Sequence, residues 1–110
     1  MNRARRPPLQ RPLAPVFDRA VDSLGVALSP ETTRHYRGTA HNFLSYLGAD
    51  HPEVQHLDQL RREPHILGWM SRLHSQVPPL VTASYINLLV ALRGICNELD
   101  RKTTRLNSSH

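Results

Sequence analysis

The chain is poor in the residues that several large classes of protein depend on. Its 110 residues include one cysteine, Cys96, so an internal disulfide is excluded, and no apolar run approaches the roughly 20 residues that span a membrane. Aromatic residues make up 5% of the chain, and apolar residues do not alternate as they do in β-strands. We therefore expect a small, reduced, cytoplasmic all-α protein without a membrane partner, whose core of Leu, Val, Ile and Ala is anchored by Trp69.

The sequence also lacks the side-chain arrangements that perform catalysis or hold a metal. Six histidines lie within residues 13–99 at no zinc-like spacing, and one cysteine cannot build a structural metal site. A glycine-rich phosphate loop and a Gly-x-Ser-x-Gly motif are both missing. Tyr36, Tyr46 and Tyr85 stand apart from any cluster of arginines and histidines, so we expect structural or surface roles for them. We predict no catalytic residue, no metal and no cofactor.

The positive charge of the chain is concentrated at its two ends. The formal net charge is +5 and the pI is about 10.3, a balance that favours a nucleic-acid partner. Residues 1–12 hold four arginines and no acid, and residues 100–110 hold three basic residues and one acid. Residues 13–99 carry seven basic and eight acidic residues, a net charge of −1. Because phosphate neutralisation supplies most of the non-specific affinity for DNA, this central part alone should bind DNA weakly at physiological salt.

Both ends of the chain lack the apolar periodicity of a folded element. Residues 1–12 combine three prolines with their arginines, which predicts a disordered basic arm that either sits on phosphates or serves only as a soluble leader. Residues 100–110 turn abruptly polar, and we expect an irregular, unstructured tail there. Their sequence resembles a translated sequencing adapter, which implies that the natural protein continues past Leu99. The folded domain is therefore expected to cover residues 13–99.

Four helices are expected in this domain. Apolar side chains recur at helical spacing over residues 14–24, which predicts the first. The second has the clearest start, because Ser29 can cap it and Pro30 suits its first position, and we expect Gly48 to end it. Its apolar stripe is expected to face the core (Tyr36, Ala40, Phe43, Leu44, Leu47), and its other side is polar (Arg34, His35, Arg37, His41, Asn42, Ser45).

The third and fourth helices are separated by residues 77–79, Val-Pro-Pro, which force an extended break. Asp58 or Glu63 is expected to cap the third helix, and the pattern does not decide between them. The fourth helix is expected to start near Thr82 or Ser84. It is apolar on most sides, which places it centrally in a bundle or under a partner.

Three stretches together resemble the core-binding domain of phage-integrase-like tyrosine recombinases. Residues 29–47 are similar to its opening helix, with a capped start, a threonine, Tyr36 and then Phe-Leu-x-x-Leu. Residues 57–73 resemble its middle element, an apolar turn followed by Ile-x-x-Trp-x-x-x-Leu. Residues 82–99 resemble its closing helix, whose hallmark is Leu-x-x-Leu-Arg followed by a hydrophobic pair. The resemblance covers about two thirds of the chain.

The resemblance implies a four-helix SAM-like bundle, two of whose helices lie across the major groove of double-stranded DNA. It also implies that a separate catalytic recombinase domain cuts the DNA, because no position here matches that domain's arginines, histidine and nucleophilic tyrosine. Recombinases of this kind associate with further copies on DNA. The implied DNA-facing residues lie on the second and fourth helices: Arg34, Arg37, His41, Ser84, Asn87 and Arg93. Arginine suits phosphate or guanine, and asparagine suits adenine.

The alternative is a helical protein–protein interaction module that does not bind DNA. SAM-like bundles also serve that purpose, and residues 13–99 are not basic. Relatives in the recombinase family often carry basic residues near the positions of Asn87 and Leu88, where this chain has a neutral pair. That departure counts against strong DNA binding. Nothing in the sequence favours a third interpretation, an enzyme in its own right.

Overall fold

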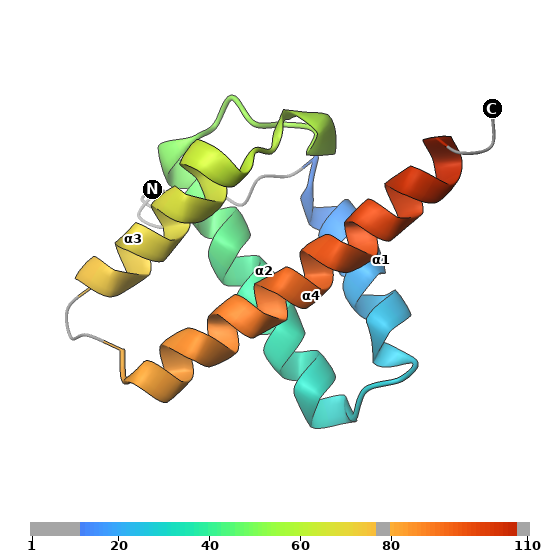
Figure 1. Cartoon of the computed structure of the whole chain (residues 1–110), viewed down its shortest axis with the longest axis horizontal. Coiled ribbons are helices and arrows are strands. Elements are labelled where there is room, and N and C mark those ends of the chain that lie inside the picture. The colour runs from blue at the N-terminus through green and yellow to red at the C-terminus, as the bar shows by residue number, and fades with distance from the viewer. Residues whose placement is uncertain (1–11, 77–79, 108–110) are drawn as a thin grey trace, which may run out of the picture.

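The computed structural model describes the backbone of residues 12–76 and 80–107, and the side chains of these residues up to Arg101. Within these residues the chain forms four helices and no strand, which confirms the predicted all-α bundle (Figure 1). Two short turns connect the second helix to the third. The predicted basic arm lies outside the described residues, apart from Pro12. The elements are α1 (Ala14–Gly25), α2 (Pro30–Asp50), η2 (Leu57–Gln59), η3 (Arg62–Ile66), α3 (Leu67–Ser75) and α4 (Thr82–Asn107).

The starts of α1 and α2 follow from their first residues, as predicted. Pro15 lies in the first turn of α1, where its missing N–H leaves no helical hydrogen bond unmade. Ser29 caps α2, because its Oγ accepts a hydrogen bond from the backbone N–H of Thr32 at 3.1 Å. Pro30 is the first residue of α2. These local signals fix the residue at which α2 begins.

Two predicted helix ends are wrong. Gly48 does not end α2, because a stop glycine needs a left-handed backbone and no glycine in the described part of the chain has a positive φ. The tail expected to be irregular over residues 100–110 begins as helix, since α4 runs to Asn107. Glu98 and Arg101 pair across this boundary at 2.7 Å, one turn apart. Such pairs stabilise a helix modestly, so α4 continues where the composition turns polar.

The start of α3 also differs from the prediction. The backbone at Glu63 is extended, as at a residue that precedes a helix, but among the described side chains no hydrogen bond from Glu63 caps the next turn. Ile66, which immediately precedes α3, makes no side-chain capping hydrogen bond either. Asp58 lies in η2, too many residues before α3 to cap a helix that begins after Ile66. Neither predicted cap is therefore used. The fourth helix begins at Thr82, one of its two predicted starts.

The core lies where α1, α2 and α4 cross, with α3 closing one end. The ring of Phe43 packs against Phe17 of α1, with 6.1 Å between ring centroids, and edge-to-face against Trp69 of α3, at 5.4 Å. Trp69 is fully buried, as predicted, and its indole N–H donates to Oδ1 of Asn42 at 2.9 Å. Phe43 thus connects three helices. The largest buried side chains are Trp69, Phe17, Phe43, Leu13, Leu47 and Ile95.

Only one side of α4 is buried in the core. Leu92, Ile95 and Leu99 are buried against α1 and α2, and α4 crosses both of these helices (Figure 1). On its outer side Ile86 and Val90 are 49% and 55% exposed. In the described residues, no helix combines the length and the apolar character that a membrane crossing requires.

Candidate nucleic-acid interface

One side of α2 is polar and open to solvent. We define the α2 surface by five residues that are exposed or, for the last, half-buried: Arg34, Gly38, His41, Asn42 and Ser45. The helix contains no acidic residue between Glu31 and Asp50. Arg34 makes no ion pair within the described part of the chain. An exposed guanidinium that pairs with no carboxylate is chemically suited to a phosphate or a guanine edge.

Arg37 is exposed, as predicted, but it is already engaged. Its terminal nitrogens bind Oδ1 of Asp18 at 3.1 Å and Oδ1 of Asp22 at 2.7 Å, both on α1. The hydrogen bond that Arg37 donates to Asp22 is the main reason that the pKa of Arg37 is raised. Two carboxylates therefore compete with any phosphate for this side chain. Arg37 should be a weaker DNA ligand than Arg34.

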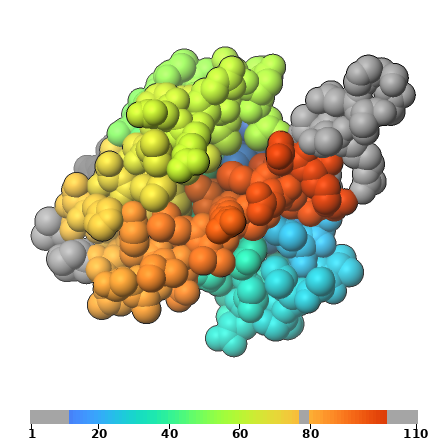
Figure 2. Space-filling view, in the orientation of Figure 1, coloured from blue at the N-terminus to red at the C-terminus, as the bar shows by residue number. Residues whose placement is uncertain are grey.

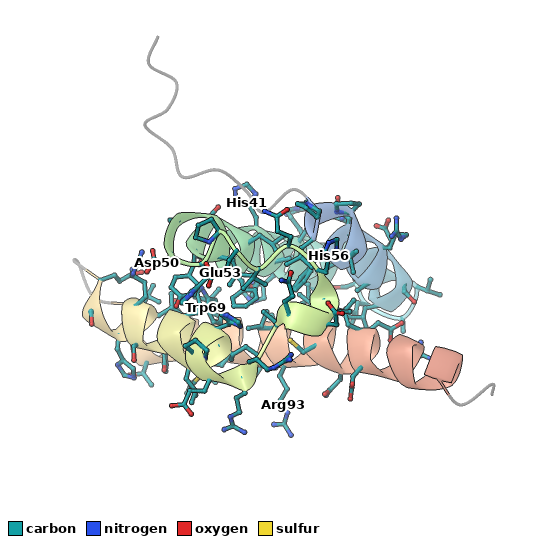
Figure 3. All side chains as sticks on the ribbon, turned by 90° about the horizontal axis from the view of Figure 1, so that it is seen from above. His41, Asp50, Glu53, His56, Trp69 and Arg93 are labelled. Carbon is teal, nitrogen blue, oxygen red and sulfur yellow. The ribbon has the colours of Figure 1, made fainter. Side chains whose placement is uncertain are left out.

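The predicted residues of α4 do not join the α2 surface as one patch. Asn87 lies beside α2, because its backbone oxygen is 3.3 Å from Nε2 of His35. Ser84, one turn earlier in α4, is half-buried. Arg93 and His41 project from opposite sides of the molecule (Figure 3). The structure thus brings Asn87 close to α2 and separates Arg93 from it.

A groove of about 510 Å³ lies between α2 and α3, and most residues of the α2 surface line one side of it. Arg72 of α3 lines it and pairs with Asp50, and its guanidinium carbon lies 5.4 Å from the centre of the Tyr46 ring. Arg72 could not be predicted from the sequence, because only the packing of α3 against α2 brings it beside the polar side of α2. The polar lining consists of His41, Asn42, Ser45, Tyr46, Arg72 and Gln76. This groove extends the α2 surface toward α3.

Gly38 occupies the middle of the α2 surface with no packing reason to be glycine. A Cβ added at Gly38 would meet no atom within 4 Å. At Gly68, by contrast, it would overlap the hydroxyl of Tyr46, and at Gly94 it would come within 3.1 Å of Cε2 of Tyr36. A glycine inside a helix costs about 1 kcal/mol relative to alanine. At Gly38 no close packing contact in the fold compensates for this loss of stability. The missing side chain leaves the helix backbone open to close approach.

Three side chains between the end of α2 and α3 come close enough to suggest a metal site. The ligand atoms of His51, Glu53 and His65 lie within 4.8 Å of one another, a proximity that the sequence spacing did not reveal. The backbone N–H of Arg61 donates to Nδ1 of His65 at 2.9 Å, so the neutral ring carries its proton on Nε2. A metal-bound histidine instead donates from its second nitrogen. Nε2 of His51 is engaged by the Tyr46 hydroxyl at 3.0 Å, and the rings of His51 and His65 pack edge-to-face with 4.9 Å between their centroids. This ring contact joins η3 to the end of α2, and we call Tyr46, His51 and His65 the histidine cluster.

Burial shifts two pKa values in the histidine cluster. It lowers the pKa of His65, and the neighbouring His51 lowers it further. It raises the pKa of the Tyr46 hydroxyl, and the negative charge of Asp50 acts in the same direction. Both shifts favour the neutral form of the group, which is consistent with a structural role.

Comparison of the chain with protein-family models, with curated protein sequences and with solved structures finds no match in any of the three. The assignment to the tyrosine recombinases stays a prediction from the sequence motifs. The residues of the chain and the geometry of the α2 surface therefore carry the proposed function.

Proposed function

We propose that the chain is a module that binds double-stranded DNA through the α2 surface and positions a recombinase catalytic domain on recombination-site DNA. The observation that carries the proposal is the exposed side of α2, which is free of acidic residues from residue 32 to residue 49. It contains Arg34, which makes no ion pair with the residues that the structure describes. A single α-helix fits the major groove of B-DNA. The motif order that resembles the core-binding domain supports the same conclusion.

The role of each residue follows from its chemistry. Arg34 would bind a phosphate or a guanine edge, and His41 and Ser45 would donate or accept hydrogen bonds along the same side of the helix. Gly38 between them lets the DNA backbone approach α2 closely. Asn87 lies near enough to α2 to contact the flanking DNA. Bond cleavage would belong to the catalytic domain.

The charge distribution supports weak binding by the bundle alone. Residues 13–99 have a net charge of −1, and the four arginines of residues 1–12 supply most of the excess positive charge. Each phosphate that a basic side chain neutralises contributes to the salt dependence of binding. We expect affinity to fall steeply with salt, partly because of residues 1–12.

Two charge reversals on opposite sides of the molecule test the proposal. In the full chain, Arg34→Glu and Arg93→Glu change the net charge equally, but only Arg34 lies on the α2 surface. Binding to a fluorescent DNA duplex is measured by anisotropy over a series of salt concentrations. We expect Arg34→Glu to weaken binding about ten-fold or more and to reduce the slope of log affinity against log salt by about 1. Arg93→Glu should have a clearly smaller effect.

Equal losses in the two variants would contradict the α2 surface as the contact site, because they would report net charge alone. Failure of the unaltered chain to bind any duplex at low salt would contradict DNA binding itself.

The alternative function, a protein-interaction module, is favoured by one observation, the exposed apolar side of α4 around Ile86 and Val90. If the chain binds no duplex, this alternative becomes the leading function.

A further inference from the structure

A second groove opens on the side of the molecule to which Arg93 points (Figure 3). It runs between α4 and the segment from η2 to α3, and Figure 2 looks onto this side, with that segment above α4. Two adjoining hollows of about 750 and 530 Å³ form it. The residues that both hollows share are Arg62, Ile66, Cys96 and Asn97. We call it the α3–α4 groove.

The floor of the α3–α4 groove is apolar and only half-covered. Ile66 and Met70 line it from one side, and Leu89 and Cys96 line it from α4. Each of these four side chains packs against the core yet remains half-buried. Burying such apolar surface is worth roughly 25 cal/mol per Å². A groove between two helices with an apolar floor is the usual receptor for the apolar side of a third helix.

The charges along the groove define what such a helix must carry. Arg93 lines one hollow, and Arg62 stands where the two hollows meet. Both are exposed, and neither pairs with a carboxylate in the described residues. Asp58 and Asp100 line the other hollow. Arg61 lies there too, but its guanidinium already donates to the backbone oxygens of two neighbours.

We propose that the α3–α4 groove binds an amphipathic helix of a partner protein, one that carries an acidic side chain beside its apolar residues. The acidic group would pair with Arg62 and Arg93, while the apolar residues would cover Ile66, Met70 and Leu89. The ends of this chain have the wrong charge for that role. Residues 1–12 contain no acid, and residues 100–110 have a net positive charge. Residues 1–12 and 100–110 are therefore unsuited to the groove, and the exposed Arg62 and Arg93 favour an acidic helix of a partner protein as the occupant.

The test uses two synthetic helical peptides that share one leucine stripe. One carries glutamates beside the stripe and the other carries lysines at the same positions. Binding of each to the full chain is measured by fluorescence anisotropy, and amide chemical shifts locate the contact. We expect the glutamate peptide to bind at least about ten-fold more tightly than the lysine peptide, because charge complementarity sets partner preference. Its shifts should fall on α3 and on α4 from Leu89 to Asn97.

A charge reversal distinguishes ion pairing with Arg62 and Arg93 from non-specific binding. The double variant Arg62→Glu/Arg93→Glu should lose the preference for the glutamate peptide and favour the lysine peptide. Arg34→Glu, on the α2 surface, should leave both affinities unchanged. Circular dichroism confirms that each variant keeps its helical content.

Three results would overturn the proposal: no binding of either peptide, equal binding of both, or a preference that survives the double reversal. The outcome is independent of DNA binding, because the α2 surface lies on the opposite side. A chain that binds duplex DNA but neither peptide would lose only this inference. A chain that binds the glutamate peptide but no DNA would lose only the proposed function.

Discussion

The hydroxyl of Tyr46 in α2 lies over the backbone of Gly68 in α3, so closely that a Cβ at Gly68 would overlap it. The same hydroxyl is hydrogen-bonded to His51 at 3.0 Å. Gly68→Ala must therefore displace Tyr46 from a buried contact. We expect the free energy of unfolding to fall by roughly 1–3 kcal/mol, although alanine favours a helix intrinsically. Urea unfolding followed by circular dichroism measures this, and an unchanged or raised stability would show that Tyr46 can move without cost.

Gly38→Ala should have the opposite effect on stability. The added methyl group meets no neighbour, so the helix gains up to about 1 kcal/mol from the better helix former. If DNA approaches the α2 surface closely, the same methyl group should weaken duplex binding. Unfolding and DNA-binding measurements on the one variant separate the two effects. A stabilised variant with unchanged DNA affinity would remove Gly38 from the interface.

Releasing Arg37 from its carboxylates should strengthen DNA binding. In Asp18→Asn/Asp22→Asn, the guanidinium loses both ionic partners and becomes available to phosphate. The matched control is Asp58→Asn/Asp100→Asn, which removes the same charge on the other side of the molecule. We expect the first variant to gain more affinity than the second, with a steeper dependence on salt. Because exposed ion pairs contribute about 0–1 kcal/mol, its stability should change little. Equal gains would mean that Arg37 does not reach the DNA.

The stability of the fold should decrease on acidification through His65. Burial, with His51 nearby, lowers the folded-state pKa of His65 below the value of about 6.5 that it has in the unfolded chain, although Glu53 acts in the opposite sense. Below about pH 6.5 the unfolded state then binds more protons than the folded state, so stability rises with pH there. We expect this contribution to be complete near pH 7.5 and to be lost as the pH falls from 6.5 through the lowered pKa.

An asparagine at this position separates the effect of His65 from that of the other histidines. In His65→Asn the amide oxygen takes the place of Nδ1 and can still accept the hydrogen bond from the backbone N–H of Arg61, but the group no longer titrates. The acid-side slope of the free energy of unfolding against pH should flatten. His56→Asn, at an exposed position, is the matched control. Identical slopes in the unaltered chain and in His65→Asn would contradict the assignment.

The thiol of Cys96 should be unreactive in the folded chain. Burial raises its pKa to about 11, and Asp100 adds to the shift. Since the thiolate is the reacting form, alkylation by iodoacetamide at pH 8 should be at least about 100-fold slower in the folded chain than in urea. Because Cys96 lines the α3–α4 groove, a peptide bound there should slow the reaction further. A folded-state rate equal to that in urea would contradict the burial of this side chain.

The starts of α1 and α2 could be predicted from the sequence because they depend on neighbours in the chain. Ser29 and Pro30 act within one turn of themselves, so their effect is readable without knowing the fold. The end of α2 could not be predicted in this way. Gly48 is compatible with a stop and with a buried helical position, and only the packing around α2 decides between the two. The polar residues after Leu99 were misjudged for a similar reason, since a helix can continue through them once the Glu98–Arg101 pair holds its last buried turn.

The candidate site could be predicted only in part. The exposure of Arg34, Arg37 and His41 followed from the periodicity of α2. The capture of Arg37 by carboxylates of α1 did not, because it depends on the angle at which two helices cross. The position of Arg93 on the opposite side from His41 likewise depends on the rotation of α4 about its axis. Periodicity determines which side of each helix is polar, but it does not determine which polar sides meet.

The chain carries a single tryptophan, and the indole of Trp69 is sealed in the interior while its N–H reaches Asn42 on the α2 surface. The intrinsic tryptophan fluorescence of the chain therefore comes from this one side chain. A contact that pulls the Asn42 amide away would alter the polarity around the indole, and a red shift without loss of helicity would report occupancy. Global unfolding would shift the spectrum together with the dichroism. Fluorescence and circular dichroism of one unlabelled sample can thus distinguish a ligand that binds to the α2 surface from one that unfolds the bundle.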